Sequence, residues 1–157
     1  VATFTLNGCT LSSIKSNEYR MADSATDAAT VYFIRPMPIR TRGIADTNVN
    51  IELNDKLVAQ LAAGEYIAVK LKPGKININL RSKTFLTSKP MPIDVHRYGE
   101  FIFDAGQTYF IQTRFTQEEF RGIYFEPKEI TLAEAKGFLK RLKPHGPIAS
   151  AKPLEKL

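Results

Sequence analysis

The sequence is poor in the residues on which most catalytic and metal sites depend. It has one cysteine and two histidines among 157 residues. A single cysteine excludes an intramolecular disulfide, so packing alone must hold the fold together. The chain also lacks the Gly-x-Ser-x-Gly motif of serine hydrolases and any glycine-rich loop that could bind a phosphate. No uncharged apolar run approaches the roughly 18 residues that a membrane-spanning helix needs.

The size and charge of the chain favour one folded domain with a basic end. The length suits a single domain, and a hydrophobic content of 43% can supply its core. Of the net charge of +6, residues 128–157 carry +4, because they hold seven basic and three acidic side chains. The first 127 residues are therefore nearly neutral, which argues against a nucleic-acid-binding body.

The one cysteine follows a short apolar segment. Residues 1–6 carry no charge, Gly8 is small, and the chain becomes polar directly after Cys9. This order resembles the lipobox of bacterial lipoproteins, in which the leader is cut before the cysteine and the new terminal cysteine is acylated. We therefore expect residues 1–8 to be a signal-peptide remnant and Cys9 to be the lipid attachment site. The alternative is a free cysteine in a disordered N-terminal segment.

Residues 10–29 are mostly small and polar, which indicates a flexible tether. Together with the lipidated cysteine they make up the expected segment 9–29. Stable anchoring needs more than one acyl chain, such as palmitate, since each buried CH2 contributes only about 0.8 kcal/mol. A triacylated Cys9 would meet that need. Thr10, and not an aspartate, follows the cysteine, and by resemblance to enterobacterial sorting this favours the outer membrane.

Residues 30–143 are expected to form the folded body. Short apolar or alternating segments are separated by turn residues, such as Asn54 and Asp55, which tolerate positive φ. The expected strands are 31–34, 49–53, 57–61, 67–71, 76–80, 101–103, 108–115 and 122–125. Residues 81–98, with two prolines, are expected to be a long loop or irregular strand. The pattern predicts a mainly β fold, an antiparallel β-sandwich of about seven to eight strands with one C-terminal amphipathic helix.

The helix is predicted by its first residues and by an apolar stripe. Thr131 and Glu134 have the spacing of a capping box, in which each side chain satisfies the other residue's backbone N–H. The apolar side chains that recur at helical spacing are Leu132, Ala135, Phe138, Leu139 and Leu142. Pro144 is expected to stop the helix, and residues 144–157 are expected to be an extended basic tail.

Basic side chains follow the same helical spacing. At 100° per residue, Lys136, Lys140 and Lys143 fall on one flank of the stripe, with Arg141 close by. This flank could contact anionic lipid or an acidic partner. The alternative is a helix packed on the sandwich with a solvated lysine edge.

The search for catalytic chemistry gives weak candidates. Asp94 and His96 lie two residues apart and would share one face of a strand. They could be metal ligands, an acid–base pair or an ordinary surface pair, and the last interpretation is favoured. Glu118 and Glu119 are expected to be a solvated turn. Five aromatic residues could form a stacking platform, but core packing is the favoured interpretation; they are Tyr66, Tyr109, Phe110, Tyr124 and Phe125. We therefore predict no catalytic residue, no metal site and no cofactor.

Several stretches, in order, resemble a bacterial domain family of unknown function, DUF2846, which is often found in predicted lipoproteins. They are ATVYFIRP at 29–36, VNIELND at 49–55, LAAGEY at 61–66, LKPGK at 71–75 and DAGQTYF at 104–110. The resemblance covers about residues 28–135. It implies a β-sandwich carried at the cell envelope, and it implies no catalytic residues.

These observations predict a non-enzymatic, lipid-anchored protein on the periplasmic face of the outer membrane. Its role would be structural, as a protein-binding module in a multi-subunit envelope assembly such as a secretion system. The tail would suit strand addition or groove binding to a partner. The alternatives are a periplasmic small-ligand or carbohydrate-binding sandwich and, less favoured, a nucleic-acid binder or an enzyme.

Overall fold

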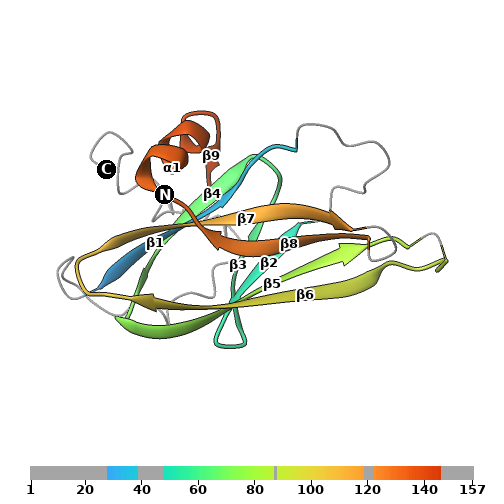
Figure 1. Cartoon of the computed structure of the whole chain (residues 1–157), viewed down its shortest axis with the longest axis horizontal. Helices are drawn as coiled ribbons and strands as arrows, with labels where there is room; N and C mark the ends of the chain where they lie inside the picture. The colour runs from blue at the N-terminus through green and yellow to red at the C-terminus, as the bar shows by residue number, and fades with distance from the viewer. Residues whose placement is uncertain (1–27, 39–47, 87, 119–121, 146–157) are drawn as a thin grey trace, which may run out of the picture.

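The computed structural model describes residues 28–38, 48–86, 88–118 and 122–145. Within these residues nine strands and one helix follow one another (Figure 1). The elements are β1 (Ala29–Arg35), β2 (Val49–Leu53), β3 (Lys56–Leu61), β4 (Glu65–Leu71), β5 (Gly74–Thr84), β6 (Ile93–Phe103), β7 (Thr108–Glu118), β8 (Gly122–Glu129), α1 (Leu132–Leu139) and β9 (Lys143–Pro144). The expected mainly β fold with a helix near the C-terminus is confirmed.

The strands form two stacked sheets. Sheet A has the order β8-β7-β1-β4-β9, and sheet B has the order β3-β2-β5-β6. Most neighbours are antiparallel, as expected of a sandwich, but β1 pairs with β7 and β4 with β9 in parallel. Parallel partners need a long connection between them. For β1 and β7 that connection is the whole run from β2 to β6, which crosses between the sheets.

The tight turn between β2 and β3 has the predicted chemistry. Asn54 and Asp55 have φ values of 47° and 65°. Two consecutive left-handed residues match the right-handed twist of the flanking strands, and Asn and Asp accept this conformation at low cost. This local signal predicts the hairpin correctly.

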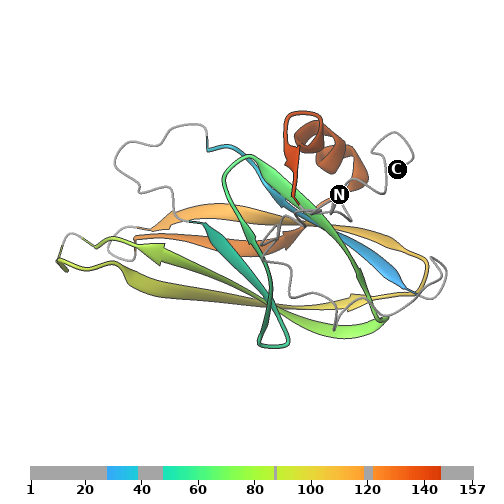
Figure 2. The ribbon, with the colours of Figure 1, turned by 180° about the vertical axis from the view of Figure 1, so that it is seen from behind.

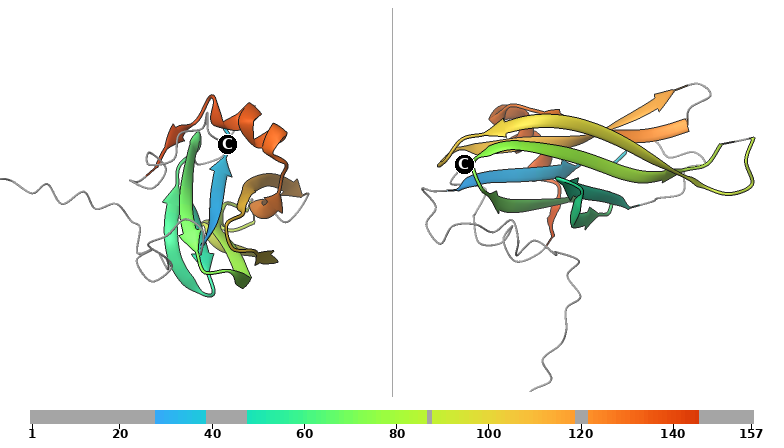
Figure 3. Two further views of the ribbon diagram at one scale, coloured as in Figure 1. Left: turned by 90° about the vertical axis from the view of Figure 1, so that its left-hand side faces the viewer. Right: turned by 90° about the horizontal axis from the view of Figure 1, so that it is seen from below.

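The expected long loop or irregular strand at 81–98 is only partly right, because only residues 85–92 connect the strands and the rest pairs regularly. β5 and β6 pair in register over eleven positions, from Gly74 opposite Phe103 to Thr84 opposite Ile93. Both prolines lie in the connection between these strands and not within β6. The inward positions 97 and 99 of β6 hold arginine and glycine, so the sequence shows no apolar alternation there. The resulting hairpin reaches past the other strands at one end of the molecule (Figure 3).

The main core lies between the two sheets. It is formed by the inward side chains of β1 to β7, with Phe101, Tyr109 and Phe125 packed at its margin. Its buried residues are Ala29, Val31, Phe33, Val49, Ile51, Leu53, Val58, Ala59, Leu61, Ile67, Val69, Leu71, Ile76, Ile78, Leu80, Phe103 and Ile111. Every residue of β1 is buried, which confirms that residues 31–34 form a central strand covered on both faces.

The other face of β1 is covered by a smaller hydrophobic cluster under α1. In Figures 1 and 2, α1 lies against the side of sheet A that faces away from sheet B. The buried residues of this cluster come from sheet A, from α1 and from the link between them. They are Tyr32, Ile34, Tyr66, Ala68, Phe110, Ile130, Ala135 and Leu139.

The predicted capping box is present at the start of α1. The Glu134 N–H donates to the Thr131 hydroxyl at 3.3 Å, and the Thr131 N–H donates to the Glu134 carboxylate at 2.8 Å. The Thr131 hydroxyl also donates to the same carboxylate at 2.8 Å. These hydrogen bonds hold the pKa of Glu134 below its ordinary value.

The helix ends earlier than expected, at Leu139, and a short strand follows it. The Lys143 N–H donates to the Gly64 carbonyl at 2.9 Å, and the His145 N–H donates to the Tyr66 carbonyl at 2.7 Å. His145 Nδ1 also lies 3.3 Å from Glu65 Oε2. These bonds attach β9 to the edge of β4. A two-residue strand has no periodicity, so the sequence could not reveal it.

Candidate functional site

A row of polar side chains crosses the outer face of sheet B. It consists of Gln60 from β3, Asn50 from β2, Arg81 from β5 and His96 from β6, and we call it the polar row. Asn50 is the cross-strand partner of both Gln60 and Arg81, and Arg81 is the partner of His96. Directly opposed residues point to the same face of a sheet. With strands about 4.8 Å apart, the row spans roughly 14 Å.

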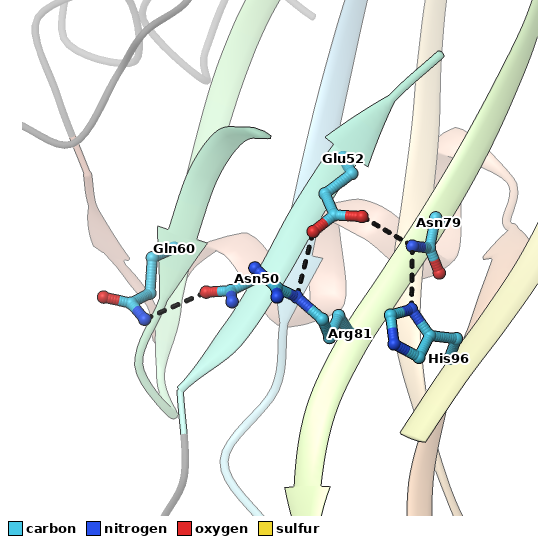
Figure 4. Close-up of polar contacts among 6 residues, drawn as sticks. All are labelled: Asn50, Glu52, Gln60, Asn79, Arg81 and His96. Carbon is cyan, nitrogen blue, oxygen red and sulfur yellow. Dashed lines mark hydrogen bonds and ion pairs between the residues drawn. The ribbon is translucent and has the colours of Figure 1, made fainter. Parts of the chain in front are cut away.

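The members of the polar row are linked to one another and to a second row beside it (Figure 4). Gln60 Nε2 donates to Asn50 Oδ1 at 2.9 Å. Arg81 Nε lies 2.9 Å from Glu52 Oε1 in an ion pair. The other oxygen of Glu52 accepts from Asn79 Nδ2 at 2.6 Å. These contacts fix the orientation of side chains from three strands.

Asn79 is the unusual member of this network. Its side chain is only 3% exposed although it belongs to the outer face. Its Nδ2 lies 3.2 Å from His96 Nδ1, while its Oδ1 has no hydrogen-bond partner among the described residues. A buried acceptor without a partner costs about 1–3 kcal/mol, so such groups are rare and mark strain or a binding site.

A polar groove lies along one side of the row. It has a volume of about 490 Å³. Its lining offers amide, guanidinium, ammonium and carboxylate groups and no apolar side chain. The lining residues are Asn48, Asn50, Gln60, Arg81, Ser82, Lys83 and Asp94. A groove of this composition can make many hydrogen bonds but gains little from apolar burial.

Two aromatic rings stand beside the polar row on β6. The rings of His96 and Tyr98 are nearly parallel, with an interplanar angle of 11° and centroids 6.3 Å apart. Tyr98 is the cross-strand partner of Asn79 and is 59% exposed. This ring surface borders the polar row on the side away from Lys83 and Asp94, which line the groove.

The structure places the residues of the predicted basic flank differently from the sequence. Lys136 lies within α1 and is half-buried, and Lys140 caps the C-terminus of the helix. Arg141 lies beyond the helix, and Lys143 belongs to β9. The expected single flank of Lys136, Lys140 and Lys143 is therefore wrong, because α1 ends before it can carry all three. Lys140, Arg141 and Lys143 are nevertheless exposed.

The remaining candidates from the sequence are Cys9, the pair Asp94 and His96, and the pair Glu118 and Glu119. Cys9 and Glu119 lie outside the described residues. Asp94 and His96 are both exposed on one face of β6, as the surface-pair interpretation expects. Among the residues that the structure describes, no group of three or more His, Cys, Asp or Glu side chains could hold a metal ion. Glu118 accepts from the Tyr124 hydroxyl, and this bond together with burial raises the pKa of Tyr124.

The five aromatic residues are packed and do not form a stacking platform, but only some of them face the sandwich core, because Tyr66 and Phe110 belong to the cluster under α1. Tyr66, Phe110 and Tyr124 are buried, while Tyr109 and Phe125 pack against the main core. Beneath α1, Tyr32 lies 6.2 Å from Tyr66 and 5.4 Å from Phe110 between ring centroids. Burial, with a smaller effect of Tyr66, raises the pKa of Tyr32 to about 12.

Sequence reasoning missed the polar row as a unit. The sequence does show polar residues at the alternate positions of 49–53 and 76–80, but this pattern is typical of the solvated side of any strand. Their convergence depends on the register of four strands, and His96 comes from the segment expected to be a loop. A cluster of Asn and Gln on the solvated face of strands, where these residues are disfavoured, is the signal that could have pointed to the row.

Comparison with known proteins gives one match. Residues 25–124 match the model of DUF2846, described as a protein of unknown function. No curated protein and no solved structure matches the chain. In the described part of the chain, no helix combines the length and apolar character needed to cross a bilayer.

Proposed function

The chain belongs to the DUF2846 family of proteins of unknown function, and we propose that it is a non-enzymatic, lipid-anchored protein of the bacterial cell envelope. Its role is to bind other envelope proteins within a multi-subunit assembly, such as a secretion system. Cys9 holds it on the periplasmic face of the outer membrane, and the segment up to residue 27 tethers the sandwich. The expected end of the tether at residue 29 is corrected, because Ala28 and Ala29 are buried in the folded body.

The observation that carries this proposal is the exposed apolar surface of the β5–β6 hairpin. Four of the seven large hydrophobic side chains that are exposed in the described residues lie between positions 85 and 102. They are Phe85, Met91, Tyr98 and Ile102, with exposures between 53% and 70%. Exposed apolar groups that gather on one element are typical of a protein-binding surface.

The position of β6 in its sheet supports the same role. β6 is the last strand of sheet B, so one of its edges is not paired within the sheet. Such an edge presents backbone donors and acceptors to an incoming strand. A partner that adds an extended segment to β6 would place its alternate side chains beside Tyr98 and Ile102. The partner is therefore a protein with an extended, partly apolar segment.

The exposed basic residues after α1 supply a second contact in this proposal. Lys140, Arg141 and Lys143 are exposed at the end of the helix and in β9, and Lys136 is half-buried beside them. A cation near an anionic membrane surface gains about 1 kcal/mol. They would hold the body close to the membrane or to an acidic neighbour.

The anchor is tested by the intact mass of the protein purified in detergent from its native membrane. We expect a chain that begins at Cys9 and carries acyl groups, and we expect the Cys9→Ala variant to leave the membrane fraction. An unmodified chain that retains residues 1–8 and stays out of the membrane contradicts the anchor.

Partner binding is tested by photo-crosslinking in cells. A photoreactive residue at Ile102 or Met91 should give one discrete adduct with an envelope protein. The matched control is Leu132, an exposed apolar residue of α1, which is 40% exposed and lies over the opposite sheet. Equal adducts from Leu132, or none from the hairpin, contradict the docking role.

A second candidate function is favoured by the polar groove. A carbohydrate-binding or small-ligand-binding module needs convergent hydrogen-bonding groups on a rigid surface. The groove over β2, β3, β5 and β6 supplies them, whereas the exposed apolar side chains of the hairpin do not.

A further inference from the structure

We propose that the polar groove on the outer face of sheet B binds a neutral oligosaccharide. The site consists of the polar row, the groove beside it and the ring surface of β6. This site shares Tyr98 with the proposed docking surface of the hairpin, whereas Met91 and Ile102 belong to the docking surface alone. Sugar binding and crosslinks from Met91 or Ile102 can therefore be measured separately.

The free hydrogen-bonding groups of the row match the chemistry of sugar hydroxyls. After the bond between them, Gln60 keeps its Oε1 as an acceptor and Asn50 keeps its Nδ2 as a donor within the described residues. Arg81 contacts Glu52 through Nε, which leaves its terminal nitrogens as donors. The row therefore presents an acceptor on Gln60 and donors on Asn50 and Arg81. A hydroxyl group both donates and accepts, so neighbouring hydroxyls of one sugar ring can use both kinds.

The charges of the site are balanced, which favours a neutral ligand. Arg81 is compensated by Glu52 at 2.9 Å. Lys83 and Asp94 are cross-strand partners of opposite charge, and both line the groove. A polyanion such as nucleic acid would need an excess of cations, and its affinity would fall steeply with salt.

The lining of the groove favours a sugar over a peptide. Peptides bind through an unpaired strand edge or through apolar pockets. The groove lies on the face of sheet B, over paired strands, and its lining has no apolar side chain. The exposed ring of Tyr98, parallel to that of His96, instead offers a flat surface on which the C–H face of a sugar ring can pack.

Asn79 orders the base of the site without contacting the ligand. Asn79 is nearly fully buried, and so is its Oδ1. The Nδ2 group of Asn79 is held by Glu52 and lies near His96, which keeps the amide in one orientation. Asn79 thereby helps to fix Glu52, the partner of Arg81.

The proposal is tested by NMR titration of the full chain, labelled with nitrogen-15, using two neutral hexasaccharides. Cellohexaose offers only hydroxyl groups, whereas chitohexaose adds acetamido groups. We expect saturable shift changes at millimolar concentration or below for at least one of them. The changes should gather at residues 48–50, at Gln60, at residues 81–83 and at residues 94–98. Absence of binding by both sugars, or changes centred on another face, would overturn the site.

Variants then test which side chains bind the sugar. The double variant Asn50→Ala with Gln60→Ala should weaken binding by about tenfold or more, which corresponds to about 1.4 kcal/mol. The matched control is Glu100→Gln, since Glu100 lies on the same face in an exposed ion pair with Lys75 at 2.8 Å. This control should bind as the native chain does. Equal loss in both variants, with both folded by circular dichroism, would refute the role of the row.

Two further measurements distinguish a neutral-sugar site from a polyanion site and from the docking surface of the hairpin. Dextran sulfate should bind no better than the neutral sugars, and stronger, salt-sensitive binding would mean that the surface is a polyanion site instead. The crosslink from Ile102 should persist in the Asn50→Ala, Gln60→Ala variant. In the native chain, an Ile102 crosslink without sugar binding would refute the sugar site alone, and sugar binding without a crosslink would refute the docking role alone.

Discussion

The outer face of sheet A is apolar and covered by α1, whereas the outer face of sheet B is polar and exposes Gln60, His96 and Tyr98. Both faces are formed by the alternate residues of each strand that point away from the core between the sheets. On sheet A the outward positions of β1 and β4 hold residues such as Tyr32, Ile34 and Ala68. On sheet B the corresponding positions hold amides and paired charges. The residue types at alternate positions thus decide which face needs a cover.

The two faces have different roles: the outer face of sheet A stabilises the fold, and the outer face of sheet B is the proposed binding surface. The cluster under α1 removes aromatic and aliphatic groups from water, which stabilises the fold. The face of sheet B keeps hydrogen-bonding groups oriented by Glu52 and Asn79 at some cost in desolvation. Substitutions on the first face should therefore change mainly stability, and substitutions on the second should change mainly binding.

The largest effect is expected where α1 meets sheet A. Leu139→Ala deletes a buried side chain of the covered cluster, and it should lower the free energy of unfolding by about 2–5 kcal/mol. The matched substitution Leu132→Ala, at an exposed position of the same helix, should cost far less. Urea denaturation followed by circular dichroism measures both. Equal losses would mean that α1 is not held by its buried side.

The next effect is a loss of stability at alkaline pH. The pKa of Tyr32 is raised to about 12 in the folded chain, while an unfolded tyrosine ionises near 10. The stabilising contribution is complete below about pH 10 and is lost as the pH rises through about 12. In that window the unfolded state releases a proton that the folded state keeps, so stability falls by about 1.4 kcal/mol per pH unit.

Denaturation midpoints between pH 9 and 12 measure this slope. Tyr32→Phe should flatten it by removing the ionising group, whatever its effect on absolute stability. An unchanged slope in this variant would show that other groups dominate, among them Tyr66, whose pKa burial also raises.

On the outer face of sheet B, Asn79 contributes to stability and also orients the side chain of Glu52. Asn79→Asp would place a second carboxylate where Nδ2 now lies 2.6 Å from Glu52. We expect a loss of about 2 kcal/mol at neutral pH, partly recovered in acid, because two close carboxyls can share a proton. Asn77→Asp, at an exposed position of the same strand and face, is the control and should be nearly neutral. Similar losses in both variants would mean that Asn79 is not an organising residue.

The sequence predicted those parts of the fold that depend on local chemistry. The capping box at Thr131, the turn at Asn54 and the apolar strand at 31–34 each involve residues close together in the chain. Only residues 101–103 of β6 were predicted, because inward positions earlier in the strand hold residues that pack on β8 and are not apolar. Arg97 lies 3.9 Å above the Tyr124 ring, and a side chain at Gly99 would collide with Phe101 and Pro127.

The candidate site was less predictable than the fold. Gln60, Asn50, Arg81 and His96 lie up to 46 positions apart in the sequence, and only the register of sheet B aligns them. The parallel pairing of β1 with β7 and the attachment of β9 to β4 are equally non-local. Local patterns also misled at the end of α1. The helical spacing of apolar residues continues past Leu139, but hydrogen bonds to distant residues place the following segment in β9.

The smallest effect tests whether the cover of sheet A depends on the helix cap. Thr131→Ala removes the hydroxyl that accepts from the Glu134 N–H and should cost about 1 kcal/mol, while Thr131→Ser should restore most of it. The pKa of Glu134 is lowered chiefly by its hydrogen bonds to Thr131. This contribution is present above the unfolded pKa and is lost as the pH falls through the lower folded value. Stability of the native chain should therefore decrease between neutral pH and pH 3 more steeply than that of Glu134→Gln. If Thr131→Ala had no effect on denaturation while Leu139→Ala had its full effect, packing on sheet A alone would hold α1 in place.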